Sequence, residues 1–395
     1  MKKDNRWTKF RHKVVVALVR PFFALVIRSK YHIQYERFRE EGKRPYLVVF
    51  NHQTAADQFF VSLLFRQHIY YIASEDIFSL GFLSKLLRYA VAPIPIKKQT
   101  TDLQAVKTCI RVAREGGSIG LAPEGNRTYH GRTVYIKPAI ASLAKKLALP
   151  IAIVRIENGY GVQPRWSDVL RKGTMRCYVK RVVEPEEYGA MSKEELDQML
   201  IRELTVDEGC VTGQFHHKNN AEFLERAIYT CPKCGLAPFE SRGDIIRCTK
   251  CGMQVRHLPT KELEGVEEDF PHRFVADWYD WQCDYIRNTA LPEGVLFEDR
   301  AALSRVNLYK SKTILDKDAA VQLYRDKLVI AGQDYPFADL GAITVLGKNK
   351  LNIYTADHLL QLKGNQRFNA LKYVNFYHKY KNESIGENNG QFLGL

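Results

Sequence analysis

The sequence lacks an apolar run long enough to cross a lipid bilayer, which takes roughly 20 residues in a helix. The longest candidate lies between Lys13 and Arg28, and Arg20 and Pro21 interrupt it. No small-residue cleavage site follows, so we do not expect a secretory signal. Internal repeats and low-complexity tracts are also missing. With 45% hydrophobic and 26% charged residues, the 395-residue chain has the composition of a folded protein, with room for two or three domains.

A disulfide framework is missing as well. Four cysteines are scattered through otherwise regular segments, namely Cys109, Cys177, Cys210 and Cys283. The other four form two Cys-x-x-Cys pairs, thirteen residues apart and each followed by glycine: Cys231 with Cys234, and Cys248 with Cys251. This spacing predicts a structural Zn²⁺ bound by four thiolates, whereas a redox dithiol, the alternative, usually needs only one such pair. Zinc thiolates beside free thiols indicate a reducing compartment, the cytoplasm.

Acidic residues are scarce in the first half of the chain. Residues 1–210 hold 35 Lys and Arg against 21 Asp and Glu, a net charge of +14. Residues 211–300 hold 11 against 15, a net of −4, and residues 301–395 hold 13 against 8, a net of +5. A basic surface attracts nucleic acid, an anionic membrane or a phosphorylated substrate, and charge alone does not distinguish among these.

The first 30 residues favour a membrane surface. Nine of them are Lys or Arg, and only Asp4 is acidic. Two short apolar segments, 14–19 and 22–27, flanked by cations are typical of helices that lie in the membrane interface. The alternatives are a buried pair of core helices with a proline kink and a true transmembrane helix.

Residues 40–210 alternate apolar strands with amphipathic helices, which predicts an α/β fold with helices covering a sheet. The expected strands are 46–50, 69–73, 92–96, 118–122, 150–156 and 175–183. The expected helices are 57–66, 79–89, 102–115, 136–147 and 192–204. The last helix opens on a capping box, with Ser192 three residues before Glu195.

Changes in composition and residue pattern divide the chain into segments. We expect interfacial helices over 1–35, the α/β domain over 36–212, a zinc ribbon over 216–260, a helical connector over 265–300 and a β domain over 302–385. The connector should hold Trp278, Trp281 and Tyr285 in one helix. The last segment shows short strands at 320–324, 328–331, 342–346, 351–354 and 359–362, hairpin turns near Gly332 and Gly347, and a closing helix at 367–379. Several hairpins closed by one helix resemble a pleckstrin-homology-like module.

The sharpest pattern is a histidine at the end of an expected strand. His52 follows the strand 46–50, and Asp57 comes five residues later, where a helix begins. A residue at the mouth of a strand faces a cleft and is held by the sheet. An imidazole there can take a proton near neutral pH, and a carboxylate can fix its tautomer and stabilise the imidazolium. The structural alternative is an aspartate that caps the helix.

Two further strand ends carry polar residues. The strand 118–122 leads into Pro123, Glu124, Gly125, Asn126 and Arg127. An arginine beside a glycine turn can bind phosphate bidentately, and the glutamate can orient it or bond a glycerol hydroxyl. The strand 92–96 ends in Lys97 and Lys98, which can also face an anion. The alternatives are a surface turn with an Arg–Glu pair and a solvated strand end.

Together these motifs resemble the lysophosphatidic-acid acyltransferase family. That family shows Asn-His-x4-Asp, a strand ending in a basic residue, Pro-Glu-Gly-Thr-Arg and a strand opening with proline. The matching positions here are Asn51 to Asp57, Lys98, Pro123 to Arg127, and Pro150, in the same order over roughly residues 40–205. The resemblance makes 36–212 an acyltransferase domain. Asn126 stands where the family has threonine, and Lys98 where arginine is usual, so the departures concern the acceptor more than the reaction.

The resemblance implies direct acyl transfer in phospholipid synthesis, at the cytoplasmic face of the cell membrane. His52 would act as general base on the hydroxyl of a lysophosphatidic-acid-like acceptor, oriented by Asp57. The acyl donor would be acyl-CoA or acyl-carrier protein, and no cysteine nucleophile is expected. The acceptor would be held by Lys98, Glu124, Gly125, Asn126 and Arg127. The apolar helix 79–89 would line an acyl path, or it is simply core.

Three other functions stay open from the sequence. The acceptor can be another lysophospholipid or an aminolipid. A zinc ribbon in a basic chain can also mean nucleic-acid binding, but the ribbon segment is net acidic, and so no nucleic acid is expected. The third is a non-catalytic membrane adaptor whose tail domain binds lipid.

Overall fold

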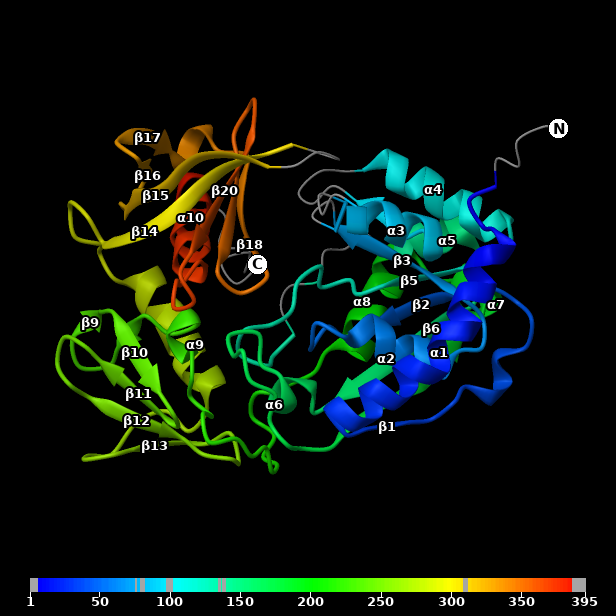
Figure 1. Ribbon diagram of the computed structural model, residues 1–395, viewed down its shortest axis with the longest axis horizontal. Helices are drawn as coiled ribbons and strands as arrows, with labels where there is room; N and C mark the ends of the chain where they lie inside the picture. The colour runs from blue at the N-terminus through cyan, green and yellow to red at the C-terminus, as the bar shows by residue number, and fades with distance from the viewer. Residues whose placement is uncertain are drawn as a thin grey trace.

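The computed structural model describes residues 6–74, 77–78, 82–96, 102–133, 136, 140–307 and 312–385. In Figure 1 an α/β unit lies on the right, and two β-rich units lie on the left, one above the other. The chain forms first the α/β unit, then the lower β-rich unit (the ribbon) and last the upper one (the tail sheet).

A seven-stranded sheet forms the centre of the α/β unit, with the order β1-β7-β6-β2-β5-β3-β4. Its strands are β1 (Ile33–Tyr35), β2 (Leu47–Phe50), β3 (Ile69–Ser74), β4 (Ile94–Ile96), β5 (Ser118–Leu121), β6 (Ile151–Glu157) and β7 (Met175–Val183). Strands β2 to β6 run parallel, β7 is antiparallel to β6, and β1 is parallel to β7. The sheet confirms the predicted α/β fold. The pattern did not predict β1, because three residues carry too little periodicity.

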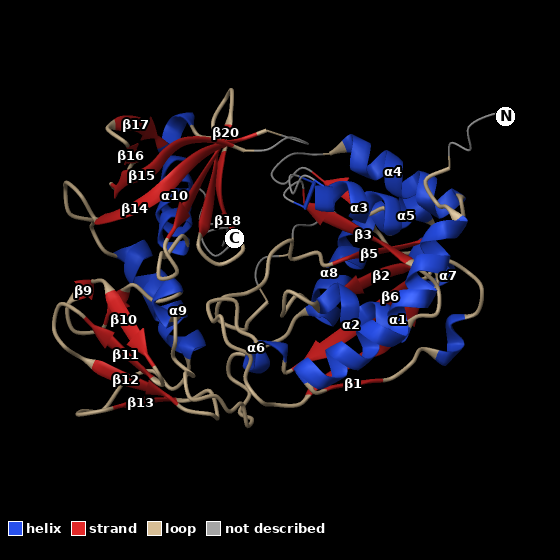
Figure 2. Cartoon of the chain, in the orientation of Figure 1, coloured by secondary structure: helices blue, strands red, loops and turns tan. Residues whose placement is uncertain are grey.

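Helices cover both faces of this sheet (Figure 2). They are α1 (Phe10–Tyr31), α2 (Asp57–Leu64), α3 (Phe82–Ala90), α4 (Leu103–Arg114), α5 (Ile140–Leu147), α6 (Gly159–Val162), α7 (Pro185–Gly189) and α8 (Lys193–Leu204). On β2, Leu47 and Val49 lie in a core with residues of α4, α5 and α8. Val48 and Phe50 lie in a second core with residues of α1 and α2. Because both faces are buried, β2 is continuously apolar in sequence.

The N-terminal segment differs from the two short helices that the sequence predicted. It forms one helix, α1, with Pro21 in its interior. An interior proline removes one backbone hydrogen bond at a cost of about 3 kcal/mol. The burial of Ile27 and Tyr31 against α2 and β1 offsets that cost. In the part of the chain that the structure describes, no helix is both long enough and apolar enough to span a bilayer.

The ribbon is built from short antiparallel strands. These are β8 (Thr230–Cys231), β9 (Gly235–Leu236), β10 (Phe239–Arg242), β11 (Ile245–Cys248), β12 (Gln254–His257) and β13 (Leu263–Gly265). Helix α9 (Val275–Asn288) follows and carries the three aromatic residues that the sequence placed in one helix. The Trp278 ring packs edge-on against the ring of Phe239, with 5.5 Å between the ring centres, so α9 packs against the ribbon.

The tail sheet has seven antiparallel strands in the order β17-β16-β15-β14-β20-β19-β18. They are β14 (Phe297–Val306), β15 (Thr313–Leu323), β16 (Lys327–Ile330), β17 (Gln333–Pro336), β18 (Ala342–Leu346), β19 (Lys350–Tyr354) and β20 (Leu359–Gly364). Helix α10 (Leu371–Ile385) packs against β18, as predicted for a β domain closed by a helix. The pattern predicted neither β14, which begins inside the expected connector, nor β17, whose residues are exposed or partly exposed and do not alternate.

Candidate active site

The candidate site begins where β2 leaves the sheet. Asn51 follows the strand and is fully buried. Its side-chain amide donates to the carbonyl of Ile156 at 2.9 Å and accepts from the N–H of Ile156 at 2.8 Å. This pair of bonds fixes the end of β2 to β6, so the next residue, His52, leaves the sheet at a defined point.

His52 and Asp57 are in direct contact. The Nδ1 atom of His52 lies 2.8 Å from Oδ2 of Asp57, which is fully buried at the start of α2. The same carboxylate accepts from the N–H of Gln53 at 2.6 Å, and from the N–H and hydroxyl of Thr54 at 2.9 and 2.6 Å. Four donors hold this carboxylate in place, and with the Nδ1–H of His52 donating to it, Nε2 carries the lone pair.

The turn after β5 reaches the same place. Glu124 is buried, and its Oε1 accepts from the backbone N–H of His52 at 2.8 Å. Gly125 makes the turn possible because its φ of +67° belongs to the left-handed region. Strands β2 and β5 are parallel neighbours, so their carboxyl ends bring the two sequence motifs together.

Arg127 ends this turn and is half-buried. Burial, together with the nearby Arg165 guanidinium, lowers the pKa of Arg127 to about 10, so it is still a cation at neutral pH. Its Nη1 atom is buried and has no hydrogen-bond partner among the described residues. A buried N–H of a guanidinium without a partner suits an anionic ligand.

The second expected cation is not placed. Lys98 lies outside the described residues, and β4 is described only to Ile96. Asn126 lies in the turn between Glu124 and Arg127 and is partly exposed. The structure thus brings together His52, Asp57, Glu124, Gly125, Asn126 and Arg127 at one edge of the sheet.

The four paired cysteines meet in the ribbon. Their sulfur atoms all lie within 4.8 Å of one another. The Sγ atoms of Cys231 and Cys251 are 3.6 Å apart, as are those of Cys234 and Cys248. Four sulfurs about 2.3 Å from a tetrahedral zinc would be about 3.8 Å apart, so this cluster fits the ion. Gly235 and Gly252, which follow the two cysteine pairs, have φ of +73° and +82°, in the left-handed region that favours glycine.

Comparison with known proteins bears on the α/β unit. Residues 28–157 match the family model described as Acyltransferase. Residues 28–157 form an acyltransferase domain. This match agrees with the acyltransferase domain predicted from the motifs, and it spans the site from His52 to Arg127. The ribbon and the tail sheet lie beyond the matched residues of the acyltransferase domain.

Two individual proteins are similar to parts of the chain. The 1-acyl-sn-glycerol-3-phosphate acyltransferase BAT2, chloroplastic, of Brassica napus is 23% identical over 141 residues, which cover 35% of this chain. That alignment covers 41% of BAT2, so the chain spans about two fifths of the length of this curated relative. The crystal structure of the 1-acyl-sn-glycerophosphate acyltransferase PlsC from Thermotoga maritima is similar with a TM-score of 0.43 and 21% identity, covering 49% of this chain and 78% of that one.

Sequence reasoning missed residues that support the acyltransferase domain from outside the motifs. A Cβ on Gly159, at the start of α6, would lie 2.6 Å from the Cβ of Gln53, so only glycine allows this close approach behind His52. Tyr31, at the end of α1, is buried close enough to Asp57 that burial and this carboxylate both raise its pKa. No local pattern marks either residue, because each acts through a contact distant in sequence.

Proposed function

We propose that this protein transfers a fatty acyl group from a thioester donor, acyl-CoA or acyl-carrier protein, to the hydroxyl of a lysophosphatidic-acid-like glycerolipid in phospholipid synthesis. The observation that carries the proposal is the 2.8 Å contact between His52 and the buried Asp57. Nε2 of His52 takes the proton of the acceptor hydroxyl as its oxygen attacks the thioester carbonyl. The thiolate of the donor leaves, and no acyl-enzyme forms.

The acceptor's phosphate would be bound by Arg127, whose buried Nη1 has no partner among the described residues. Asp57 stabilises the imidazolium that forms on His52, and the N–H bond to Glu124 holds the histidine backbone in place. The partly exposed helix α3 would line the path of the acyl chain. Another lysophospholipid or an aminolipid is the alternative acceptor, since Asn126 and Lys98 depart from the family pattern.

The test is a transfer assay with lysophosphatidic acid and radiolabelled acyl-CoA, using membranes that contain the wild-type chain, His52→Ala or Asp57→Asn. We expect labelled phosphatidic acid from the wild type and near-complete loss with His52→Ala. Asp57→Asn should lower kcat by a factor on the order of 10³, because an amide no longer fixes the tautomer or the imidazolium. His358→Ala is the control, since this histidine is exposed on the tail sheet. Equal activity of His52→Ala and the wild type would contradict the proposal, whereas lipid binding without transfer in the wild type would favour an adaptor.

We also propose that the chain is a peripheral protein of the cytoplasmic membrane face. Large apolar side chains of α1 are exposed at Phe10, Leu18, Phe22 and Leu25, between 67% and 81%. Their helical spacing places them on one side of α1, and Lys and Arg residues flank them. Helix α3 packs beside α1 and exposes Phe82 at 80%. An apolar face rimmed by cations suits an anionic lipid surface.

For the ribbon we propose a structural Zn²⁺. The ion would be held by Cys231, Cys234, Cys248 and Cys251 and would supply folding free energy rather than chemistry. The ribbon's strands have two to four residues each, and its core, in which Trp278 and Phe239 pack together, is continuous with the core of the tail sheet. A metal that joins the two Cys-x-x-Cys turns would add stability that such short strands lack.

A further inference from the structure

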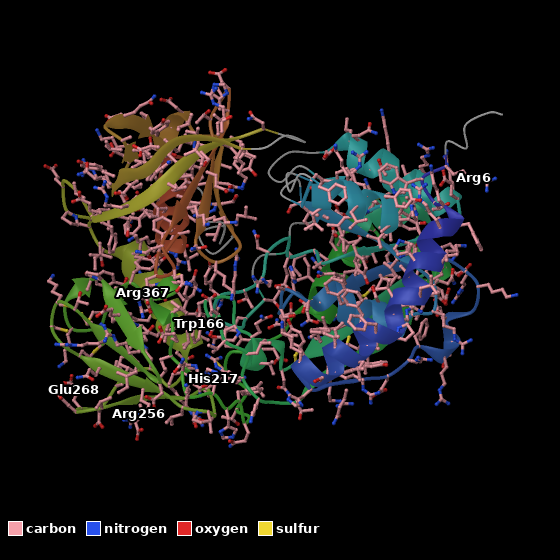
Figure 3. All side chains as sticks on the ribbon, in the orientation of Figure 1. Arg6, Trp166, His217, Arg256, Glu268 and Arg367 are labelled. Atoms are coloured by element: carbon pink, nitrogen blue, oxygen red, sulfur yellow. The ribbon has the colours of Figure 1, made fainter. Side chains whose placement is uncertain are left out.

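One arginine joins the acyltransferase domain to the tail sheet. The guanidinium of Arg165 donates from Nη1 to the carbonyl oxygen of Arg127 at 2.8 Å. On its other side it donates to the carbonyl of Val345 from Nη2 and to that of Gly347 from Nε, both at 3.1 Å. These two carbonyls belong to the end of β18 and the turn that follows it. Trp166, the next residue in the chain, is labelled in Figure 3 where the α/β unit meets the other two units.

The charge of Arg165 is buried without a carboxylate. The side chain is 2% exposed, stacks over Tyr129 at 4.5 Å, and forms no ion pair within the described ranges. Burial lowers the pKa of Arg165. A guanidinium nevertheless keeps its proton in proteins, so we treat the side chain as a cation. The guanidinium groups of Arg165 and Arg127 repel each other, and Asp57, the carboxylate that favours the charged form of Arg127, already accepts bonds from His52, Gln53 and Thr54. Burying a charge without a partner costs free energy, which an anion bound at Arg127 would offset.

The tail turn itself is held firmly against the α/β unit. Lys348, directly after Gly347, donates to Oδ1 of Asp168 at 2.7 Å and to the carbonyl of Ser167 at 2.5 Å. Asp168 also pairs with the buried Arg226 at 2.9 Å. The carbonyls that Arg165 binds in the tail sheet are therefore held in place by Lys348. Through Arg165 they also fix the backbone of Arg127.

We infer that Arg165 is a positioning residue of the acceptor site and that the turn after β18 contributes to this site by holding Arg165. Arg165 holds the Arg127 loop at a fixed distance from His52, and its own charge raises the positive potential where the acceptor's phosphate binds. The tail sheet would then tune affinity for a phosphate-bearing acceptor without touching it. This inference rests on the proposed function, because it takes Arg127 as the phosphate ligand.

The first experiment compares Arg165→Met and Arg165→Lys with the wild type in the full chain, using lysophosphatidic acid. Arg165→Met should raise KM for this acceptor by about tenfold while kcat changes by less than about threefold, because the loss falls on binding. The KM of Arg165→Lys should lie between those of the wild type and Arg165→Met, since lysine keeps the charge but cannot bond all three carbonyls. A kcat loss at unchanged KM would overturn the inference.

A matched control comes from the same loop. Arg171 is also 2% exposed, stacks over Trp166 at 4.8 Å and donates to two carbonyls, those of Gly161 and Asn220. Arg171→Met should lower thermal stability as Arg165→Met does but leave KM unchanged. Equal rises in KM for the two variants would mean that a merely structural loss explains the effect, and the inference would be wrong.

A binding measurement separates the inference from the proposed function. sn-Glycerol 3-phosphate should raise the melting temperature of the wild type and of Arg171→Met but not that of Arg165→Met. If the wild type is stabilised yet transfers no acyl group, the proposed function fails and the anion site stands. If Arg165→Met keeps the full stabilisation, or the wild type shows none, the inference fails. Should Arg165→Met not fold, Lys348→Met decides. It removes the bonds that hold the turn and also a cation that interacts with Arg127, so it should raise KM by about threefold. An unchanged KM would contradict the inference.

Discussion

The buried carboxylate of Glu124 accepts a hydrogen bond from the backbone N–H of His52 at 2.8 Å, across 72 residues of sequence. Through this bond the turn after β5 fixes the histidine from behind, while Asp57 fixes its ring. His52, the proposed base, and the turn after β5, the proposed phosphate site, are therefore joined to each other at the carboxyl end of the sheet. The proposed direct transfer between two bound substrates would need such fixed placement.

The exposed face of α1 predicts how the chain meets lipid. Replacing Leu18, Phe22 and Leu25 together by serine should reduce sedimentation with vesicles of phosphatidylglycerol by about tenfold or more, since each side chain contributes roughly 1.5–3 kcal/mol when buried. Secondary structure should be unchanged, because the three side chains are largely exposed. Val295→Ser, on an exposed apolar residue between α9 and β14, is the control and should sediment like the wild type. Equal sedimentation of the triple variant would argue against α1 as the membrane face.

The four cysteines predict one zinc ion. Freshly purified chain should contain roughly one equivalent of zinc, and Cys248→Ser should contain far less. Removing the ion should loosen the packing of Trp278 on Phe239, so the tryptophan fluorescence should shift to longer wavelength. Cys109→Ala is the control for zinc content, because this buried cysteine lies on α4, away from the cluster. A wild-type content below about half an equivalent would contradict the four-thiolate site.

Two buried histidines predict acid sensitivity of the contact between α1 and β3. Burial lowers the pKa of His12 and of His68 from 6.5 to about 4, and their rings lie 6.1 Å apart beside Tyr70. The unfolded chain therefore binds more protons between pH 6.5 and 4, and the free energy of unfolding should decrease as the pH falls through this window. His68→Gln should show a shallower decrease in urea titrations at several pH values. The exposed His358→Gln should follow the wild type, and identical slopes for all three proteins would show that His68 is not responsible.

Much of the fold followed from periodicity. The strands and helices of the α/β unit alternate along the chain, and the buried strand β2 is apolar at every position. The tail hairpins were marked by Gly332 and Gly347, both of which have positive φ. Local patterns were insufficient for β1, which has three residues, and for α1, where the packing of its last turn overrides the proline.

The candidate site divides in the same way. The pairing of His52 with Asp57 could be predicted locally, because a strand, a turn and the first residue of a helix place them within reach of each other. The cysteine cluster could be predicted as well, since its members come in two close pairs. The support of His52 by Glu124 and the link from Arg127 through Arg165 to the tail sheet became apparent only from the packing. These contacts depend on which strands become neighbours and on how separate units pack, and no short stretch of sequence encodes the order of strands in a sheet.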